Sequence, residues 1–250
     1  MKKLLTMAFI FFSVCFSGCV IVNLMDVNTV RPEGKQEEYK ISVREFNSIR
    51  INGHCNVIYY SAPSDTITLK VHPNLLQYYE ISIVNNELII NTTKRINYNY
   101  SDTATLMVSV PELKSLIIDG FGGGFGSLNS FTTMDKINTD SFSLIIRSAG
   151  NGKIELDVDE FIADISGACD MEFTGKAYSA NIKLAGAGEM NAFSLQTRSS
   201  TVNFSGTGTI RLNCTDNLNV NASGVGTVEY TGSPNLNLNT SGVVNVRKVN

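Results

Sequence analysis

The chain has 250 residues, a formal net charge of −3 and a pI of about 5.5. It contains no tryptophan, and no basic run follows Lys3, so it lacks the positive patch that nucleic-acid binding requires. A chain of this length can bury a sizeable apolar core without disulfide cross-links.

The first residues have the order of a secretory signal. Lys2 and Lys3 precede a nearly continuous apolar stretch at residues 4–16, which is short for a membrane span. Ser17 and Gly18 before Cys19 resemble the lipobox of bacterial lipoproteins, which implies that residues 1–18 are removed and that Cys19 is lipidated. The alternatives are an ordinary signal peptide cleaved nearby and an uncleaved anchor. Residues 19–38 show no period and are expected to form a tether.

From residue 39 onward, alternating apolar and polar residues predict β-strands and no helix. Residues 79–91 are predicted to form a hairpin around Asn85 and Asn86, because asparagine tolerates the positive φ of a two-residue turn. We expect this hairpin to flank or cap one end of the fold, since an uncovered sheet edge invites association.

Two loops hold candidate ligand-binding residues. Tyr98 and Tyr100 lie in a polar loop and suit stacking on sugars or contact with protein; the alternative is a loop that only shields the end of the fold. Phe121 and Phe125 lie in the glycine-rich residues 120–126, which lack the third glycine of a dinucleotide loop and the Lys-Ser or Lys-Thr of a phosphate loop. We therefore expect an elaborated corner with an exposed apolar tip.

The second half of the chain repeats a Ser/Ala-Gly-x-Gly pattern. The first glycines are Gly167, Gly186, Gly206, Gly224 and Gly242, spaced 19, 20, 18 and 18 residues apart. Such a period is typical of a solenoid, whose coils bury their apolar side chains only against neighbouring coils. Positions at even offsets from these glycines are mostly apolar and those at odd offsets mostly polar, as strands with one buried face require.

The predicted fold is an all-β, right-handed parallel β-helix or solenoid, with an antiparallel hairpin in its N-terminal half. It forms one domain over residues 39–250. We expect the two glycines of each repeat to mark a corner with positive φ or with a close approach of one chain segment to another.

The best enzymatic lead is a pair of carboxylates. Asp170 and Glu189 occupy equivalent repeat positions, one residue past the second glycine, and Lys153 is expected to precede them in the same column. Two carboxylates can supply an acid and a base if their environments separate their pKa values. A Lys-Asp-Glu column is more often a row of solvated ion pairs, which is the interpretation favoured here.

Other chemistry is weakly indicated. His54 and His72 are the two histidines, and neither belongs to a zinc-binding spacing, so no metal and no cofactor are predicted. If residues 1–18 are removed and Cys19 is lipidated, three thiols remain: Cys55, Cys169 and Cys214. Because three is an odd number, they cannot all be paired in disulfides within the chain.

Three features of the sequence belong together: Val-Arg-Glu-Phe-Asn-Ser-Ile-Arg-Ile-Asn-Gly at 43–53, Val-Pro-Glu-Leu at 110–113, and the serial Ser-Gly-x-Gly coils. Together they resemble the head GIN-domain family of putative auto-transporter adhesins, known from Bacteroides-type lipoproteins. The resemblance implies a β-solenoid with an adhesive or binding role and brings no catalytic residues. Cys55, Cys169 and Val244 depart from it by replacing second glycines.

The function predicted from the sequence is that of a lipid-anchored, non-catalytic protein of the cell envelope, presenting a rigid solenoid for adhesion or ligand binding. We expect an outer-membrane lipoprotein that faces either the periplasm or the cell surface. Its expected partners are a membrane bound through Cys19, a glycan or protein ligand, and a second copy that joins at a solenoid end near Val249. The alternative is a polysaccharide-active β-helix lyase or hydrolase that uses Asp170 and Glu189.

Overall fold

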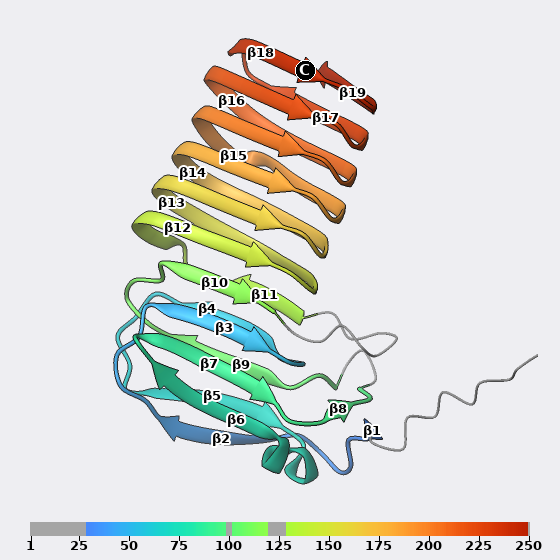
Figure 1. Cartoon of the computed structure of the whole chain (residues 1–250). Helices are drawn as coiled ribbons and strands as arrows, with labels where there is room; N and C mark the ends of the chain where they lie inside the picture. Colours follow the sequence, from blue (N-terminus) through green and yellow to red (C-terminus); the bar gives the residue numbers. More distant parts are fainter. Residues whose placement is uncertain (1–28, 99–101, 120–128, 250) are drawn as a thin grey trace, which may run out of the picture.

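The structure is a computed structural model that describes residues 29–98, 102–119 and 129–249. Its strands form a β-solenoid of about six turns above a mixed half-barrel (Figure 1), which confirms the predicted solenoid. One short 3-10 helix, η1 (Pro73–Tyr78), joins two strands of the half-barrel. Within these residues, no helix combines the length and apolar character needed to cross a membrane.

The C-terminal half is a stack of parallel coils, each with two strand faces. Face A carries β10, the end of β12, the second halves of β13 to β16, and β18; face B carries β11, the first halves of β13 to β16, β17 and β19. The strand bounds are β10 (Ser115–Ile118), β11 (Asn129–Thr133), β12 (Ile137–Ile146), β13 (Ala149–Ile165), β14 (Ala168–Leu184), β15 (Ala187–Phe204), β16 (Thr207–Ala222), β17 (Val225–Thr231), β18 (Asn235–Thr240) and β19 (Val243–Lys248).

Two corners join the faces of each coil. The glycine corner leads from face A to face B between consecutive long strands. The side corner leads from face B to face A inside β13, β14, β15 and β16, which run through it as continuous strands.

The first glycines line up in single file at the glycine corner. A Cβ added to Gly186 would lie 1.8 Å from the carbonyl oxygen of Gly167, and one added to Gly206 would lie 2.0 Å from that of Gly186. The same holds for Gly224 above Gly206, at 2.1 Å. Successive coils therefore pass too close for any side chain, which confirms the expected close approach.

The second glycines add a backbone requirement. Gly188 and Gly208 have φ of 137° and 142°, in the region that L side chains rarely adopt, and each also lies against the carbonyl of the coil before it. The expectation of positive φ is thus confirmed for this column. Cys169 occupies the same column between Gly150 and Gly188 and has no positive φ.

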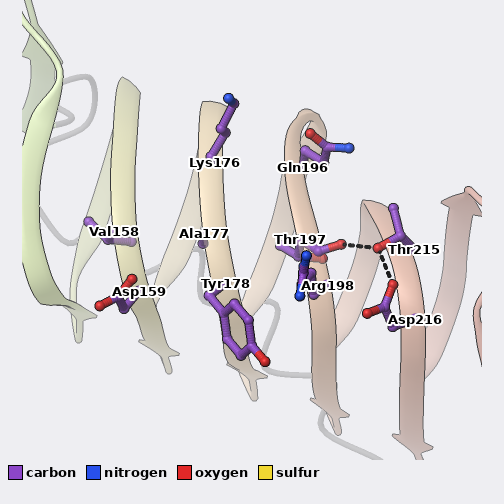
Figure 2. Close-up of a pocket in the computed structure, with 10 residues that line it drawn as sticks. All are labelled: Val158, Asp159, Lys176, Ala177, Tyr178, Gln196, Thr197, Arg198, Thr215 and Asp216. Carbon is purple, nitrogen blue, oxygen red and sulfur yellow. Dashed lines mark hydrogen bonds between the residues drawn. The ribbon is translucent and has the colours of Figure 1, made fainter.

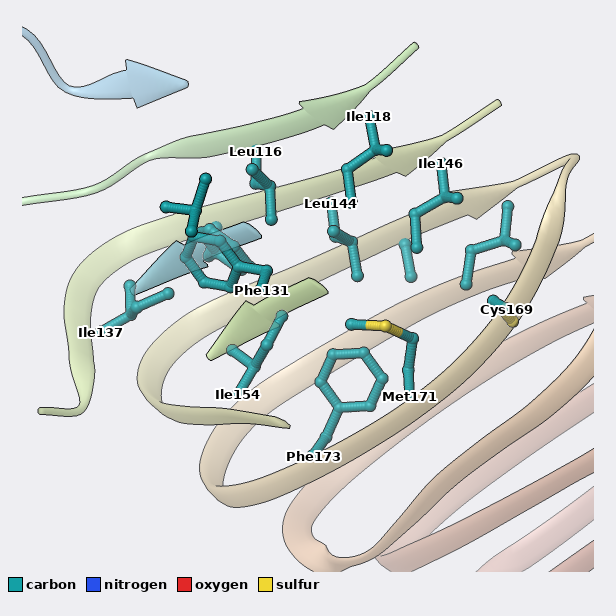
Figure 3. Packing of buried hydrophobic residues seen from close by; sticks show 14 of the residues in the cluster. Leu116, Ile118, Phe131, Ile137, Leu144, Ile146, Ile154, Cys169, Met171 and Phe173 are labelled. Carbon is teal, nitrogen blue, oxygen red and sulfur yellow. The ribbon is translucent and has the colours of Figure 1, made fainter. Parts of the chain in front are cut away.

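The interior is filled by columns of aliphatic and aromatic side chains (Figure 3). Phe142 and Phe161 stack in one column of face A with ring centroids 6.3 Å apart, and Phe173 of face B packs tilted against Phe161 at 4.9 Å. All three are fully buried, and burying one such side chain contributes about 1.5–3 kcal/mol. Because each coil supplies one layer of this core, the coils stabilise one another in series.

The N-terminal half begins inside the stack. A coil made of β3 and β4 pairs in parallel with β10 and β11 on one side, and with β7 and β9 on the other. Antiparallel strands then close this end: β6 pairs with β7, β5 with β9, and β2 with β5. The bounds are β2 (Glu37–Ser42), β3 (Ser48–Asn52), β4 (Asn56–Tyr60), β5 (Thr66–Val71), β6 (Tyr79–Val84), β7 (Glu87–Thr92) and β9 (Thr105–Ser109).

The predicted hairpin is the β6–β7 pair. Its turn residues, Asn85 and Asn86, have φ of 49° and 61°, as a two-residue turn requires. The hairpin forms the last strands of face A at this end of the fold, and β5 and β2 form the last strands of face B. Both groups of strands therefore cover this end.

Part of the segment expected to be a tether is paired in the structure. The short strand β1 (Thr29–Val30) runs parallel to β8 (Arg95–Ile96), and β2 already begins at Glu37. The opposite end of the solenoid carries accessible apolar side chains on β18 and β19: Leu236 and Leu238 are 41% and 45% exposed, and Val243 is 74% exposed.

Gly206→Ala should lower the free energy of unfolding by about 3 kcal/mol, because the new methyl group collides with the Gly186 carbonyl and forces two coils apart. Urea denaturation followed by circular dichroism measures this change. The matched control is Ser205→Ala on the neighbouring residue, where the coil below already carries Ala185; its effect should stay within about 0.5 kcal/mol. Equal, small effects of both variants would contradict the crowded corner.

Candidate functional site

The carboxylate pair predicted from the sequence lies on face B. Asp170 of β14 is opposite Glu189 of β15 in the parallel register, as expected. Lys153 is not in this column: it is opposite Glu172 and forms an ion pair with it at 2.8 Å. The assignment of Lys153 was wrong because Ser148, not Gly150, occupies the first-glycine position of its coil, which shifts the register by two residues.

Glu189 belongs to a ladder of ion pairs that continues toward the C-terminus. Arg211 bridges Glu189 at 3.0 Å and Glu229 at 3.1 Å, and Arg247 binds the other side of Glu229. The hydrogen bonds to Glu189 and Glu229 raise the pKa of Arg211, and those from Arg247 and Arg211 lower the pKa of Glu229. Glu189 is therefore paired with a cation on an exposed sheet face, which suits an ion-pair row.

Tyr98 is not the exposed ring that the sequence suggested. It is 5% exposed, and its hydroxyl is 2.6 Å from that of Tyr79, which donates a hydrogen bond to the His54 carbonyl. Its ring lies edge-on to the His54 ring at 6.5 Å. Tyr98 thus packs the half-barrel and cannot stack on a sugar without leaving the core. The other candidates, Tyr100, Phe121, Phe125 and Cys19, lie outside the described residues.

The three cysteines of the described chain are free and buried. Burial raises the pKa of Cys55 to about 12 and that of Cys169 to about 11. Such thiols carry almost no thiolate near neutral pH, so they fill corners of the core and are poor nucleophiles.

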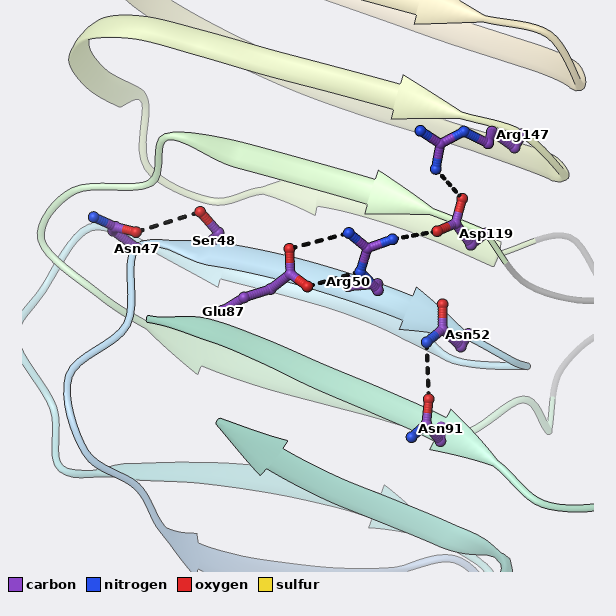
Figure 4. Close-up of polar contacts among 8 residues, drawn as sticks. All are labelled: Asn47, Ser48, Arg50, Asn52, Glu87, Asn91, Asp119 and Arg147. Carbon is purple, nitrogen blue, oxygen red and sulfur yellow. Dashed lines mark hydrogen bonds and ion pairs between the residues drawn. The ribbon is translucent and has the colours of Figure 1, made fainter. Parts of the chain in front are cut away.

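A second polar row crosses face A where the half-barrel meets the solenoid (Figure 4). Arg50 of β3 binds Glu87 of β7 at 2.7 Å on one side and Asp119, just after β10, on the other. Asp119 also binds Arg147 at 2.7 Å. These half-buried pairs tie together strands that are neighbours in space but distant in sequence, which is a structural role.

A groove along the side corner is the candidate binding site (Figure 2). It has a volume of about 550 Å³ and crosses β13 to β16. Its floor is formed by the small, buried side chains Val158, Ala177 and Thr197. We call it the corner groove; its lining residues are Val158, Asp159, Lys176, Ala177, Tyr178, Gln196, Thr197, Arg198, Thr215 and Asp216.

Two rows of exposed side chains border this floor. One row contains Asp159, Tyr178 and Arg198 on successive coils and continues to Asp216; the other contains Lys176 and Gln196. The side chain of Tyr178 is 59% exposed, and the Arg198 guanidinium lies over its ring, 5.4 Å from the centroid. That cation–π contact fixes the ring at the groove edge.

The polar groups of the groove divide into fixed and available ones. Thr197 is buried, and its hydroxyl is held by Ser200 at 2.7 Å and by the Asn213 carbonyl at 2.9 Å. By contrast, within the described ranges the side-chain amide of Gln196 and the side-chain carboxylate of Asp159 neither donate nor accept a hydrogen bond. The groove therefore offers both donors and acceptors to a ligand.

The corner groove is not among the sites predicted from the sequence, although the sequence carries its spacing. Asp159, Tyr178, Arg198 and Asp216 are 19, 20 and 18 residues apart, the same spacing as the glycines. Polar residues at outward positions predict only a solvent-exposed face, and the structure shows which of them share a corner. A larger hollow of about 930 Å³ lies between the loops of the half-barrel, beside Phe46, Asp65 and Pro111, but Phe46 is only 4% exposed and offers no ring to a ligand.

The buried His54 should make the fold sensitive to mild acid. Burial, and then the charge of Arg95, lower the pKa of His54 below its ordinary value of 6.5, so the unfolded chain takes up this proton first. The contribution of neutral His54 to the free energy of unfolding is complete above pH 6.5. It is lost as the pH falls toward the pKa of His54 in the folded protein. The urea midpoint should therefore decrease between pH 7 and pH 5, and His54→Gln should flatten this slope. An equal slope in both proteins would contradict the assignment.

Comparison with solved structures shows the same fold in several bacterial proteins. A putative adhesin from Bacteroides fragilis superposes with a TM-score of 0.78 at 22% identity, covering 88% of this chain and 100% of that one. A putative adhesin from Parabacteroides merdae superposes with a TM-score of 0.63 at 19% identity. A protein from Parabacteroides distasonis, described as a putative lipid binding protein, superposes with a TM-score of 0.65 at 19% identity. Each of these two alignments covers 89% of this chain and 100% of the other chain.

No curated protein matches the chain. A family model described as "Putative auto-transporter adhesin, head GIN domain" matches residues 45–234, which contain the strands from β3 to β17. The chain therefore belongs to the head GIN-domain family of putative auto-transporter adhesins.

Proposed function

We propose that the protein is a non-catalytic binding protein of the cell envelope, held to a membrane by a lipid on Cys19, and that the corner groove receives its ligand. The observation that carries this proposal is the groove itself: an accessible channel with a closely packed floor and exposed donors, acceptors and one aromatic ring. Membership of a family of putative adhesins and the fold shared with solved putative adhesins agree with a binding role.

Binding is favoured over catalysis by the state of the carboxylates. Asp170 and Glu189 do not line the corner groove, and Glu189 is bound to Arg211. A glycosidase-type acid and base flank a bound substrate, which requires a cleft between them. In the described part of the chain, no group of His, Cys, Asp and Glu side chains is arranged to hold a metal ion.

Lipid anchoring and envelope location rest on the N-terminal sequence. A signal of residues 1–18 followed by Cys19 would leave the mature chain attached by its first residue. The paired segment from β1 onward would then begin close to that anchor, with the solenoid projecting away from the half-barrel.

Association with a second copy also remains a prediction. β18 and β19 carry the accessible apolar side chains Leu238 and Val243, whereas the half-barrel end is covered by antiparallel strands. Sedimentation of Val243→Lys against the unaltered protein tests this: a dimer that dissociates in the variant supports it, and two monomers contradict it.

Cys19→Ser should abolish acylation and release the protein from the membrane fraction, because the thiol is the proposed attachment point. Metabolic labelling with a fatty-acid analogue and fractionation measure both effects. Cys15→Ser is the matched control, since Cys15 lies in the same apolar segment and should leave labelling intact. Label retained in Cys19→Ser would disprove the anchor.

The full chain, purified in mild detergent, should bind a ligand on an array of glycans and matrix proteins without changing it. Any glycan that binds is incubated with the protein and analysed by mass spectrometry, and its mass should be unchanged. Asp170→Asn combined with Glu189→Gln should bind as the unaltered protein does. Cleavage that this double variant loses would replace the binding proposal with the enzymatic alternative.

A further inference from the structure

We infer that the corner groove binds a neutral, linear oligosaccharide lying along the solenoid axis, with one sugar ring packed against Tyr178. The inference rests on the proposed binding function and names its ligand class.

The shape of the groove favours a linear chain. Its lining residues come from four consecutive strand corners, in β13, β14, β15 and β16, so its long direction follows the stacking direction of the coils (Figure 2). Parallel strands stack about 4.8 Å apart, so each coil offers one set of side chains over a length close to that of one pyranose ring. A polymer of repeating sugars therefore matches the repeat of the protein.

Irregularities in the register help to open the groove. β15 pairs with β16 with shifts between Ala192 and Gln196 and between Thr197 and Ser199, on either side of the groove floor. Bulges of this kind absorb the different lengths of consecutive coils and re-aim neighbouring side chains. Arg198 lies inside the second shift, next to the ring of Tyr178.

The charges of the groove favour a neutral ligand. Lys176 and Arg198 are cationic, and Asp159 and Asp216 are anionic, so the four formal charges cancel. The two carboxylates would repel an acidic polymer, and the two cations would repel a basic polymer. Sugar hydroxyl groups both donate and accept hydrogen bonds, so they can use the carboxylates, the cations and the Gln196 amide together.

Tyr178 supplies the stacking surface. Its ring is exposed at the groove edge, and Arg198 covers it from the side of β15. The apolar C–H face of a pyranose can pack on an aromatic ring while its hydroxyl groups turn toward polar partners. The closely packed floor of Ala177 and Thr197 leaves room for a ring of this size beside Tyr178.

The test is isothermal titration of the full chain in detergent with a panel of hexasaccharides. Neutral probes are linear hexamers of glucose, xylose and mannose; a galacturonic acid hexamer is the acidic probe and a glucosamine hexamer the basic one. At least one neutral probe should bind, with an affinity that increases from disaccharide to hexasaccharide. Because the ligand is uncharged, the affinity should change little between low and high salt.

Tyr178→Ala should weaken binding of that neutral probe about tenfold, which corresponds to the loss of one aromatic contact. Tyr178→Phe should retain binding, because it keeps the ring. Lys153→Ala, at an exposed position of face B away from the groove, is the matched control and should leave affinity unchanged. Tyr178 is exposed, so these variants should fold, and circular dichroism verifies this.

Three results would overturn the inference: no neutral probe binds, only a charged probe binds, or binding survives Tyr178→Ala. If the array described above yields a protein ligand and no glycan, this inference fails while the binding function stands. Cleavage of a bound glycan would instead remove the binding function itself.

Discussion

The structure depends on how closely consecutive coils approach one another. Parallel backbone hydrogen bonds join each coil to the next. At the glycine corner the amide of Thr207 donates to the Gly186 carbonyl at 2.9 Å, and a Cβ on Gly206 would lie 2.0 Å from the same oxygen. A Cβ at Gly186, Gly206 or Gly224 would collide with the carbonyl of the coil before it and separate the two coils. The glycines therefore fix the register, and the register fixes every column of side chains inside and outside the solenoid.

The same register builds the outer surface. Once the coils are stacked, residues spaced like the glycines must line up, which produces the ion-paired column of Arg211, Glu229 and Arg247 on face B and the corner groove at the side. Glu189 joins this column from the neighbouring one, where it is opposite Thr209. A ladder on a flat face satisfies its own charges. At the side corner, the row with Tyr178 and Arg198 and the row with Lys176 and Gln196 point away from each other on either side of the groove floor. Their side chains therefore remain accessible to a ligand. The fold thus separates a face whose charges are paired with one another from the corner where we propose that a ligand binds.

Much of the solenoid could be predicted from the sequence because its constraint is local. The spacing of Gly167, Gly186, Gly206 and Gly224 reports directly on a close approach that leaves no room for a Cβ at these four positions. The error at Lys153 arose where that signal fails, since Ser148 holds the first-glycine position and Gly150 and Gly152 offer a false register. Tyr98 was misjudged for a different reason. It is buried against Tyr79 and His54, which the half-barrel brings to it from distant parts of the chain, and this arrangement leaves no periodic trace in the sequence.

The stacked register can be measured by electron paramagnetic resonance with pairs of spin labels on face A. Asn237 is separated from Ser143, Ser115 and Ser48 by five, six and seven strand steps in one column. At about 4.8 Å per step, the distances should be about 24, 29 and 34 Å. Ser48, although it is the most distant in sequence, must lie only one step beyond Ser115. Distances that do not increase in equal steps, or a Ser48 label closer to Asn237 than the Ser143 label, would contradict the stacked-coil architecture.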